Sequence, residues 1–257
     1  VLLARDGFDV DDDLADSLPS AVRRFSPWPS SRAIFIHGDG RPLGRGDRLV
    51  QGDLAATLEL IMKHGPSGFY EGETARKIVA AVESAGGRMT RDDLASYRAV
   101  EREPVRGTYR GREIVSMPPP SSGGAHVIEI LNILEGFDIA SLGHNSAATI
   151  HLMAEAMKLA YADRSKYLGD PDFVKVPIAG LTSKAYAEKL RSRISLERAR
   201  PSQDIGPGAP YESDQTTHYS VVDAQGNAVS NTYTLNFSYG LGLVAPGTGV
   251  LLNNELD

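Results

Sequence analysis

The stretch "SDQTTHYSVVDAQGNAVSNTYTLN", residues 213–236, contains two strand-like segments joined by a Gly-Asn turn. Polar and apolar side chains alternate over 217–223 and again over 227–235, which is the period of a β-strand. The stretch also carries more hydroxyl groups than a structural hairpin needs. Four of them belong to threonines near the strand ends: Thr216, Thr217, Thr232 and Thr234. We therefore ask whether this hairpin has a chemical role.

The composition of the chain is that of a globular protein. Of its 257 residues, 41% are hydrophobic and 23% are charged, and the net charge is −6. Acidic and basic residues are interspersed, which argues against a nucleic-acid partner. No apolar run reaches about 18 residues, so the sequence predicts no transmembrane segment in this chain. The absence of cysteine excludes disulfides, thiolate catalysis and cysteine-based metal sites.

Helical periodicity dominates the chain before residue 200, and strand periodicity follows it. We expect the first 50 residues to be rich in loops, because they contain Pro27, Pro29 and many turn residues. The predicted helices are 52–65, 72–87, 90–97, 128–134, 145–170 and 183–193. The predicted strands are a pair within 105–117 and single strands at 217–223, 227–235 and 248–254, with an exposed loop over 200–214. This order predicts an α+β fold, as a single domain because the last segment is too small to bury its own core.

Two of the helices predict further detail. In 52–65, Asp53 is the expected N-cap and Gly65 is the expected stop signal. In 145–170, the i, i+3, i+4, i+7 pattern defines an apolar stripe. Its members are Ile150, Met153, Ala154, Met157 and Tyr161.

A threonine hydroxyl is a poor nucleophile unless a base lies beside it. One arrangement supplies that base without a second residue, because a threonine at the start of a chain can use its own α-amino group, whose ordinary pKa is about 8. An exposed loop that runs into a threonine at the head of a strand suits the required backbone cut. The loop 200–215 followed by Thr216 has this layout, and Thr234 on the next strand could hydrogen-bond the nucleophile. The alternative is that threonine is simply a good strand former.

Residues 216–240 resemble the signature of the γ-glutamyltranspeptidase family. The matching positions are Thr216-Thr217-His218, Ser220, Gly226-Asn227, Val229, Thr232, Thr234, Asn236 and Tyr239-Gly240. The resemblance continues through "MPPPSSGG" (117–124), "YADRSKYLGDPDFVKVP" (161–177) and "GVLLNNELD" (249–257). Essentially the whole chain resembles the central portion of such an enzyme, so we expect a single incomplete domain, 1–257, continued at both ends.

The resemblance implies an N-terminal nucleophile hydrolase fold, with stacked antiparallel sheets between helical layers (αββα), here incomplete. It also implies a precursor that cuts itself between Gln215 and Thr216. Residues 1–215 would then be the C-terminal part of a large subunit, and 216–257 the N-terminal part of a small subunit, held together as a heterodimer. Thr216 would be the nucleophile in self-cleavage and in turnover, and Thr234 would orient it and lie by the substrate.

Asn236 and Glu255 match residues that hold the two ends of the γ-glutamyl group. The chemistry fits, since an amide donor suits an α-carboxylate and a carboxylate suits an α-ammonium through a charge-assisted hydrogen bond. The alternative for Glu255 is a solvated charge at a strand end. The substrate-gripping arginine and the Gly-Gly oxyanion hole of the family are expected outside this chain.

The implied activity is γ-glutamyl transfer and hydrolysis from glutathione and other γ-glutamyl compounds, through a threonine ester and without a cofactor. The partners would be a small γ-glutamyl substrate and an amino-acid or peptide acceptor, in a periplasmic or secreted location. One alternative is a cephalosporin or glutaryl acylase of the same superfamily. Another is an inactive fragment or homologue with only a structural role.

Three further features favour structural roles. His218 lies two residues beyond Thr216, on the same strand face, and we expect it to pack there rather than to act as a base. "SSGG" (121–124) could bind an anion at a helix N-terminus, but it lacks the lysine and spacing of a phosphate loop and is expected to be a turn. Asp170 and Asp172 around a proline indicate a capped turn rather than a calcium site. The histidine spacing supports no metal site.

Overall fold

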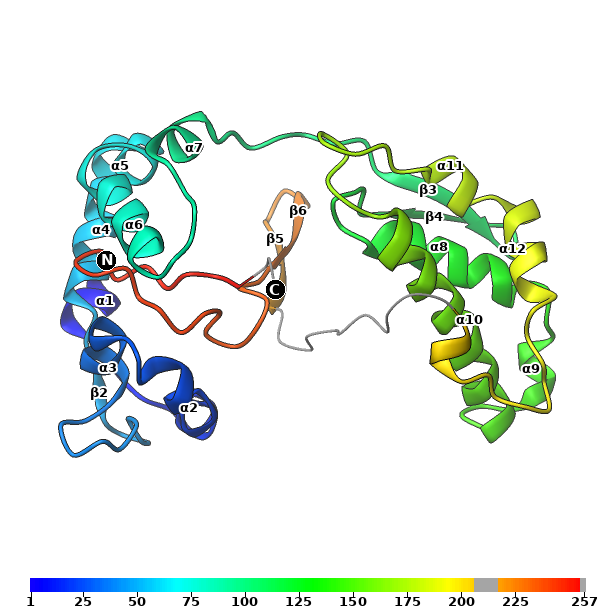
Figure 1. Cartoon of the computed structure of the whole chain (residues 1–257), viewed down its shortest axis with the longest axis horizontal. Helices are drawn as coiled ribbons and strands as arrows, with labels where there is room; N and C mark the ends of the chain where they lie inside the picture. Colours follow the sequence, from blue (N-terminus) through cyan, green and yellow to red (C-terminus); the bar gives the residue numbers. More distant parts are fainter. Residues whose placement is uncertain (206–216, 255–257) are drawn as a thin grey trace. The chain divides into compact units, whose positions relative to one another are not determined.

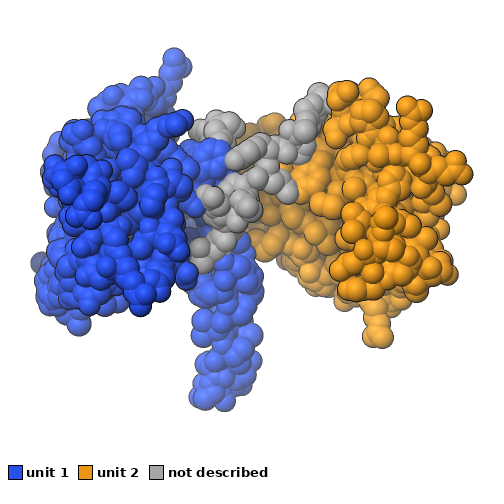
Figure 2. Space-filling view, turned by 90° about the horizontal axis from the view of Figure 1, so that it is seen from below, with its two compact units in different colours: residues 1–99, 213–257 blue, residues 100–212 orange. Residues whose placement is uncertain are grey.

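The computed structural model describes residues 1–205 and 217–254. Its contacts divide the chain into two compact units, coloured separately in Figure 2. Unit 1 consists of Val1–Ala99 and Ser213–Asp257, and unit 2 is Val100–Glu212. The expected single domain and the expected subunit boundary at residue 216 stay predictions. No helix in the described ranges combines the length and the apolar content that a membrane span needs.

Unit 1 is built mainly from helices (Figure 1). They are α1 (Leu2–Asp6), α2 (Asp12–Phe25), α3 (Pro29–Phe35), α4 (Gly52–His64), α5 (Ser67–Tyr70), α6 (Gly72–Ser84) and α7 (Arg91–Ser96). Two short antiparallel pairs accompany them: β1 (Phe8–Asp9) with β2 (Arg48–Leu49), and β5 (Thr217–Val222) with β6 (Ala228–Tyr233). The two strands of the opening stretch are thus confirmed.

The expectation of a loop-rich start is wrong, because α1, α2 and α3 occupy much of the first 50 residues. Asp11 caps α2 by accepting a hydrogen bond from the backbone of Leu14, which satisfies one of the unpaired amides at the helix start. Leu18, Ala21 and Phe25 then recur along one face of α2 and are fully buried. That helical period was present in the sequence, but the surrounding prolines and turn residues obscured it.

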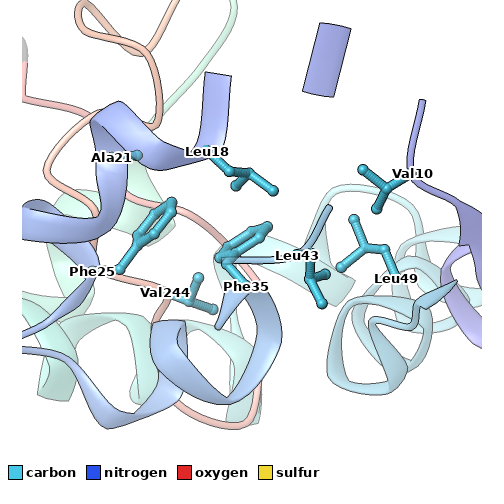
Figure 3. Close-up of a cluster of buried hydrophobic side chains, with 8 residues drawn as sticks. All are labelled: Val10, Leu18, Ala21, Phe25, Phe35, Leu43, Leu49 and Val244. Carbon is cyan, nitrogen blue, oxygen red and sulfur yellow. The ribbon is translucent and has the colours of Figure 1, made fainter. Parts of the chain in front are cut away.

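The main hydrophobic cluster of unit 1 joins residues from the first 50 positions to the segment that follows β6 (Figure 3). Its members are Val10, Leu18, Ala21, Phe25, Phe35, Leu43, Leu49 and Val244. Phe25 stacks on Phe35 with ring centroids 4.7 Å apart, and Tyr239 meets Phe25 edge-on at 5.1 Å. The segment that follows β6 is therefore anchored on α2 and α3.

The predicted strand at 248–254 is wrong, because the described part of this segment forms only an isolated bridge, between Val244 and Leu251. Gly247 and Gly249 both have positive φ, which breaks an extended chain. A Cβ on Gly249 would lie 2.3 Å from the backbone nitrogen of Leu54, so the segment passes against the start of α4. Thr57 of α4 holds it there by donating to the carbonyl of Thr248 at 2.7 Å.

The predicted details of α4 are half right. Gly65 ends the helix with φ +63°, as expected, but the helix starts at Gly52 with Gln51 in the cap position, two residues before the expected Asp53 cap. In α7, Thr90 and Asp93 form a complete capping box. The start of α7 is therefore set locally by its own sequence.

Unit 2 packs helices on a β-hairpin (Figure 1). The hairpin is β3 (Val105–Tyr109) with β4 (Arg112–Ser116), as predicted for 105–117. The helices are α8 (Gly123–Leu134), α9 (Ile139–Leu142), α10 (Ala147–Tyr167), α11 (Ile178–Leu181) and α12 (Lys184–Arg191), followed by one 3₁₀ turn, η1 (Ser202–Asp204). Helix α8 lies at the centre of this unit and contacts the hairpin, α10 and α12.

The apolar stripe expected on α10 is not the face that packs within unit 2. Ile150, Met153 and Met157 are 57%, 45% and 39% exposed there. Leu152, Ala156 and Leu159 are buried instead, against α8 and α12. Helix α10 is apolar on more than one side, so periodicity alone could not choose between its faces.

A polar cluster is buried in the core of unit 2. Glu129 of α8 is fully buried, and its Oε2 lies 2.8 Å from Nδ1 of His126, one turn earlier on the same helix. Asp163 of α10 faces Glu129 and accepts a hydrogen bond of 2.7 Å from the hydroxyl of Tyr186 on α12. Three helices thus contribute ionisable groups to one apolar core.

Candidate active site

The predicted site residues fall into two groups. Gln215, Thr216 and Glu255 lie outside the described residues, so their assigned roles stay predictions. Thr234 and Asn236 are described, and both follow directly on β6. The described part of the site consists of the hairpin and the residues around Thr234.

The β5–β6 hairpin has one regular antiparallel register, from Thr217↔Tyr233 to Val222↔Ala228. Asp223 organises the turn: its Oδ1 accepts from the backbone amides of Gln225 and Asn227 at 2.9 and 2.8 Å. Its Oδ2 accepts from the side-chain amide of Asn227 at 2.8 Å. These bonds, the Asn227 side chain first, lower the pKa of Asp223, and Gly226 supplies the positive φ of the turn. The turn thus fixes which residues of the two strands are opposite.

The chain turns sharply where β6 ends. Thr234 Oγ1 accepts a hydrogen bond of 2.9 Å from the backbone amide of Asn236, whose φ is +72°. Asn236 Nδ2 donates to the carbonyl of Asn254 at 3.0 Å. The Asn254 side chain in turn accepts from the backbone amide of Phe237 at 3.1 Å. Thr234 is therefore hydrogen-bonded to Asn236, and Asn236 is hydrogen-bonded to Asn254, which directly precedes Glu255 in the chain.

Helix α2 also contacts the chain just after this turn. Arg24 donates a 2.7 Å hydrogen bond to the carbonyl of Ser238, and its guanidinium lies 5.5 Å from the ring centre of Phe237. The hydroxyls of Ser17 and Tyr239 are hydrogen-bonded, and burial raises the pKa of Tyr239. The supports hold the 235–241 loop in a left-handed conformation at Tyr239, φ +64°.

A pocket of about 250 Å³ opens at Thr234. It is lined by Ser17, Tyr233, Thr234, Leu235, Phe237, Ser238 and Tyr239. Its lining combines hydroxyls, aromatic rings and one leucine, and it comes from α2, from the end of β6 and from the loop that follows β6. The pocket can hold a small, partly apolar group beside the Thr234 hydroxyl.

Sequence reasoning missed Ser17 and Arg24 as supports of the site. Each contacts a residue more than 200 positions away, so no local pattern links them to Thr234. Asn254 lay inside the family-like motif, but its role as the partner of Asn236 could be recognised only from the turn geometry.

The three features expected to be structural have clear contacts. A Cβ on Gly124 would lie 2.0 Å from the carbonyl oxygen of Met117, so the "SSGG" turn needs glycine for close backbone approach. Arg102 makes hydrogen bonds of 3.1 and 2.6 Å to the carboxylate of Asp172, whose amide donates to Asp170. His218 contacts the hydroxyls of Ser230 and Thr232 across the hairpin. No group of three or more histidine or acidic side chains suited to a metal occurs in the part of the chain that the structure describes.

Comparison with known proteins identifies the family. The profile described as "Gamma-glutamyltranspeptidase" matches residues 1–257. The chain is 55% identical to the glutathione hydrolase proenzyme of Escherichia coli (strain K12), over 99% of this chain and 44% of that protein. It is 45% identical to the acylase ACY 1 proenzyme of Pseudomonas sp. (strain SE83), over 99% of this chain and 45% of that protein.

A solved structure agrees with these relatives. The γ-glutamyltranspeptidase of Helicobacter pylori superposes with a TM-score of 0.74 at 44% identity, over 83% of this chain and 62% of that one. The chain thus spans somewhat less than half the length of the curated relatives it matches. On these matches, the chain belongs to the γ-glutamyltranspeptidase family of N-terminal nucleophile hydrolases.

Proposed function

We propose that the complete protein containing this chain is a γ-glutamyltransferase and glutathione hydrolase that acts through a threonine ester. The observation that carries the proposal is the turn after β6, where Thr234, Asn236 and Asn254 are joined by hydrogen bonds. This turn places a hydroxyl and an oriented amide together, next in sequence to a carboxylate. In γ-glutamyl transfer, the Thr234 hydroxyl would orient the nucleophile Thr216, and the amide and the carboxylate would grip the free amino-acid end of the substrate.

The reaction has two stages. Thr216, once freed by cleavage of the Gln215–Thr216 bond, attacks the γ-amide carbonyl with its Oγ while its own α-amine takes the hydroxyl proton. The tetrahedral intermediate collapses, the C–N bond breaks, and the leaving amine departs with a proton, which leaves a γ-glutamyl ester on Thr216. Water then releases glutamate, or the amine of an amino acid or peptide takes the γ-glutamyl group. Thr234 orients the nucleophile, and no cofactor takes part.

Substrate selection follows from the charges of the γ-glutamyl group. The Asn236 amide would donate to its α-carboxylate, and Glu255 would accept from its α-ammonium. Asn254 supports both assignments, because its carbonyl orients the Asn236 side chain and it directly precedes Glu255. Removal of either contact would leave one charged end of the substrate without a partner.

The architecture that we propose has stacked antiparallel sheets between helical layers. The exposed face of α10, with Ile150, Met153 and Met157, supports this arrangement, because a helix in an outer layer must cover a sheet with an apolar face. Residues 1–215 and 216–257 would belong to two subunits of a heterodimer produced by self-cleavage. We also propose a periplasmic or secreted location.

The second candidate is acylase activity on cephalosporin or glutaryl substrates. The observation that favours it is the 45% identity with an acylase proenzyme. A glutaryl group has no α-ammonium, so a glutaryl substrate would not use the carboxylate of Glu255. The two candidates therefore share the nucleophile and differ in the grip on the acyl group.

The test compares the wild-type complete protein with a Thr216→Ala variant. Wild type should yield a small subunit that begins at Thr216, and the variant should remain one chain without activity. Wild type should release p-nitroaniline from γ-glutamyl-p-nitroanilide and cleave glutathione. Turnover of glutaryl-cephalosporin alone would favour the acylase. An uncut wild type that turns over neither substrate would indicate a purely structural role.

A further inference from the structure

His218 is hydrogen-bonded to two hydroxyls on one face of the β5–β6 hairpin, and a third hydroxyl continues the row. Its Nδ1 lies 2.7 Å from Thr232 Oγ1, and its Nε2 lies 2.9 Å from Ser230 Oγ. Ser230 Oγ lies 3.1 Å from Ser220 Oγ, directly across the ladder. We call Thr232, His218, Ser230 and Ser220 the hydroxyl row. Both ring nitrogens are thus engaged with β6, so the imidazole bridges the two strands.

The imidazole determines which hydroxyls of the hydroxyl row donate hydrogen bonds and which accept them. A neutral ring has one donor and one acceptor nitrogen, whereas a hydroxyl can rotate to do either. One of the two hydroxyls must therefore accept from His218, and the other must donate to it. Tyr219 and Tyr233 meet edge-on at 6.4 Å on the opposite face. Among the described residues of β5 and β6, His218 is thus the one acid–base side chain on the face of the hydroxyl row.

The hydroxyl row lies next to the two threonines of the proposed reaction. His218 and Thr232 form the second pair of the ladder, and Thr217↔Tyr233 is the first. The chain neighbours of that first pair are Thr216 and Thr234. The strands are exposed, and the Asp223 turn that sets their register lies at the opposite end of the ribbon. Side-chain bridges close to this end therefore matter for how the two threonines are held.

We propose that His218 is a positioning residue, which bridges Thr232 and Ser230 and thereby fixes the strand spacing at the end of the hairpin that carries Thr216 and Thr234. The inference rests on the proposed function of those two threonines. His218 takes no proton from the nucleophile, because the α-amine of Thr216 serves as the base. Its role is to hold the strands that carry the reacting groups.

Three substitutions separate the two bridges. His218→Ala removes both. His218→Asn keeps an amide near the position of Nδ1 and so retains the contact with Thr232. His218→Gln reaches toward the position of Nε2 and Ser230. Asn231→Ala, on the opposite face of β6, is the matched control for loss of a polar side chain.

Each variant is made in the complete protein, and three quantities are measured: the rate of self-cleavage, kcat and KM for γ-glutamyl-p-nitroanilide. His218→Ala removes the two hydrogen bonds from His218 to β6. We therefore expect kcat to fall by about 5–100-fold and self-cleavage to slow by a similar factor. KM should change less than about twofold, because the substrate contacts remain. His218→Asn or His218→Gln should recover part of both losses, and Asn231→Ala should match wild type.

A double-mutant cycle tests the bridge itself. Thr232→Val removes the hydroxyl while keeping the shape, so its effect should nearly vanish in the His218→Ala background. This cycle, and the amide variants, keep the test decisive if His218→Ala fails to fold. Additive losses, equal behaviour of His218→Ala and Asn231→Ala, or a rise in KM alone would overturn the proposal. If Thr216→Ala kept activity, the proposed function itself would fail, which is a separate outcome.

Discussion

Replacement of Glu129 by glutamine should make the core of unit 2 more stable at alkaline pH. Burial, and then the hydrogen bond with Asp163 and its negative charge, raise the pKa of Glu129 to about 9. Burial, and then the charge of Arg164, lower the pKa of His126 to about 4. Their 2.8 Å contact would suit an ion pair, but burial is the main cause of both shifts and favours the neutral forms of both groups. We therefore treat the contact as a neutral hydrogen bond.

The sign of the pH effect differs between the two groups. The unfolded chain loses the Glu129 proton near pH 4.5, whereas the folded chain keeps it to about pH 9, so stability falls with rising pH across that window. The unfolded chain gains the His126 proton below pH 6.5, whereas the folded chain gains it near pH 4, so stability rises with pH between those values. The two slopes cancel between pH 4.5 and 6.5. Above 6.5 only the fall due to Glu129 remains.

The magnitude follows from the width of the uncompensated window. One pH unit corresponds to about 1.4 kcal/mol per proton, so the free energy of unfolding should fall by about 3 kcal/mol between pH 6.5 and 9. Glu129→Gln keeps a donor and an acceptor on the same shape, but it has no proton to lose. The variant should therefore show no such fall. Glu135→Gln at the end of α8 is the control, because Lys184 lowers the pKa of Glu135 and its titration lies far below this window.

The assay is urea unfolding of the chain at a series of pH values, followed by hydrogen exchange of amides in α8 and α10. The single tryptophan, Trp28, belongs to unit 1, so its fluorescence would report on the wrong core. Wild type and Glu135→Gln should lose stability in parallel above pH 6.5, and Glu129→Gln should not. Parallel slopes for all three proteins would refute the neutral state of Glu129, as would a Glu129→Gln variant less stable than wild type at pH 8.

Three further predictions concern the site and the start of α8. Glu255→Ala should raise KM by about 10–150-fold with little change in kcat, because the ammonium contact is made equally before and during reaction; steady-state kinetics on processed protein checks this, and a loss confined to kcat would contradict it. Thr234→Ala should show the reverse profile and also slow self-cleavage, since both reactions use Thr216; an effect on KM alone would exclude this role. Gly124→Ala should destabilise unit 2 by more than the ~1 kcal/mol of an ordinary helix substitution, because its Cβ would lie 2.0 Å from the Met117 oxygen. Thermal unfolding measures the loss of stability. Gly123→Ala is the control, because the nearest contact of its Cβ would be at 3.5 Å.

Local signals predicted the elements that are set locally. The Thr90–Asp93 capping box and the glycine stop at Gly65 were readable because each needs only neighbouring residues. The strand expected at 248–254 failed because close approach to Leu54, nearly 200 residues away, bends the chain at Gly247 and Gly249. The prediction of which face of α10 is buried failed because Ile150 and Leu152 are equally apolar, so only tertiary contacts decide which of the two is covered.

The candidate site shows the same division. Thr234 and Asn236 were identified through a gap-free motif, and the structure brings them together at one turn. Ser17 and Arg24 were not, because α2 reaches that turn only through folding. The sequence thus singled out Thr234 and Asn236, whose roles stay predictions, but it did not reveal the residues that support them.

The cluster in Figure 3 has a consequence for the proposed self-cleavage. Val244 and Tyr239 come after residue 216, and they pack on Phe25 and Phe35, which come before it. After a cut at Gln215–Thr216, one hydrophobic core would therefore consist of two polypeptides. Dissociation of the pieces and unfolding of that core would become a single event, so the folded state of mature protein would depend on dilution. The precursor would melt at a temperature independent of concentration, and the processed form would not.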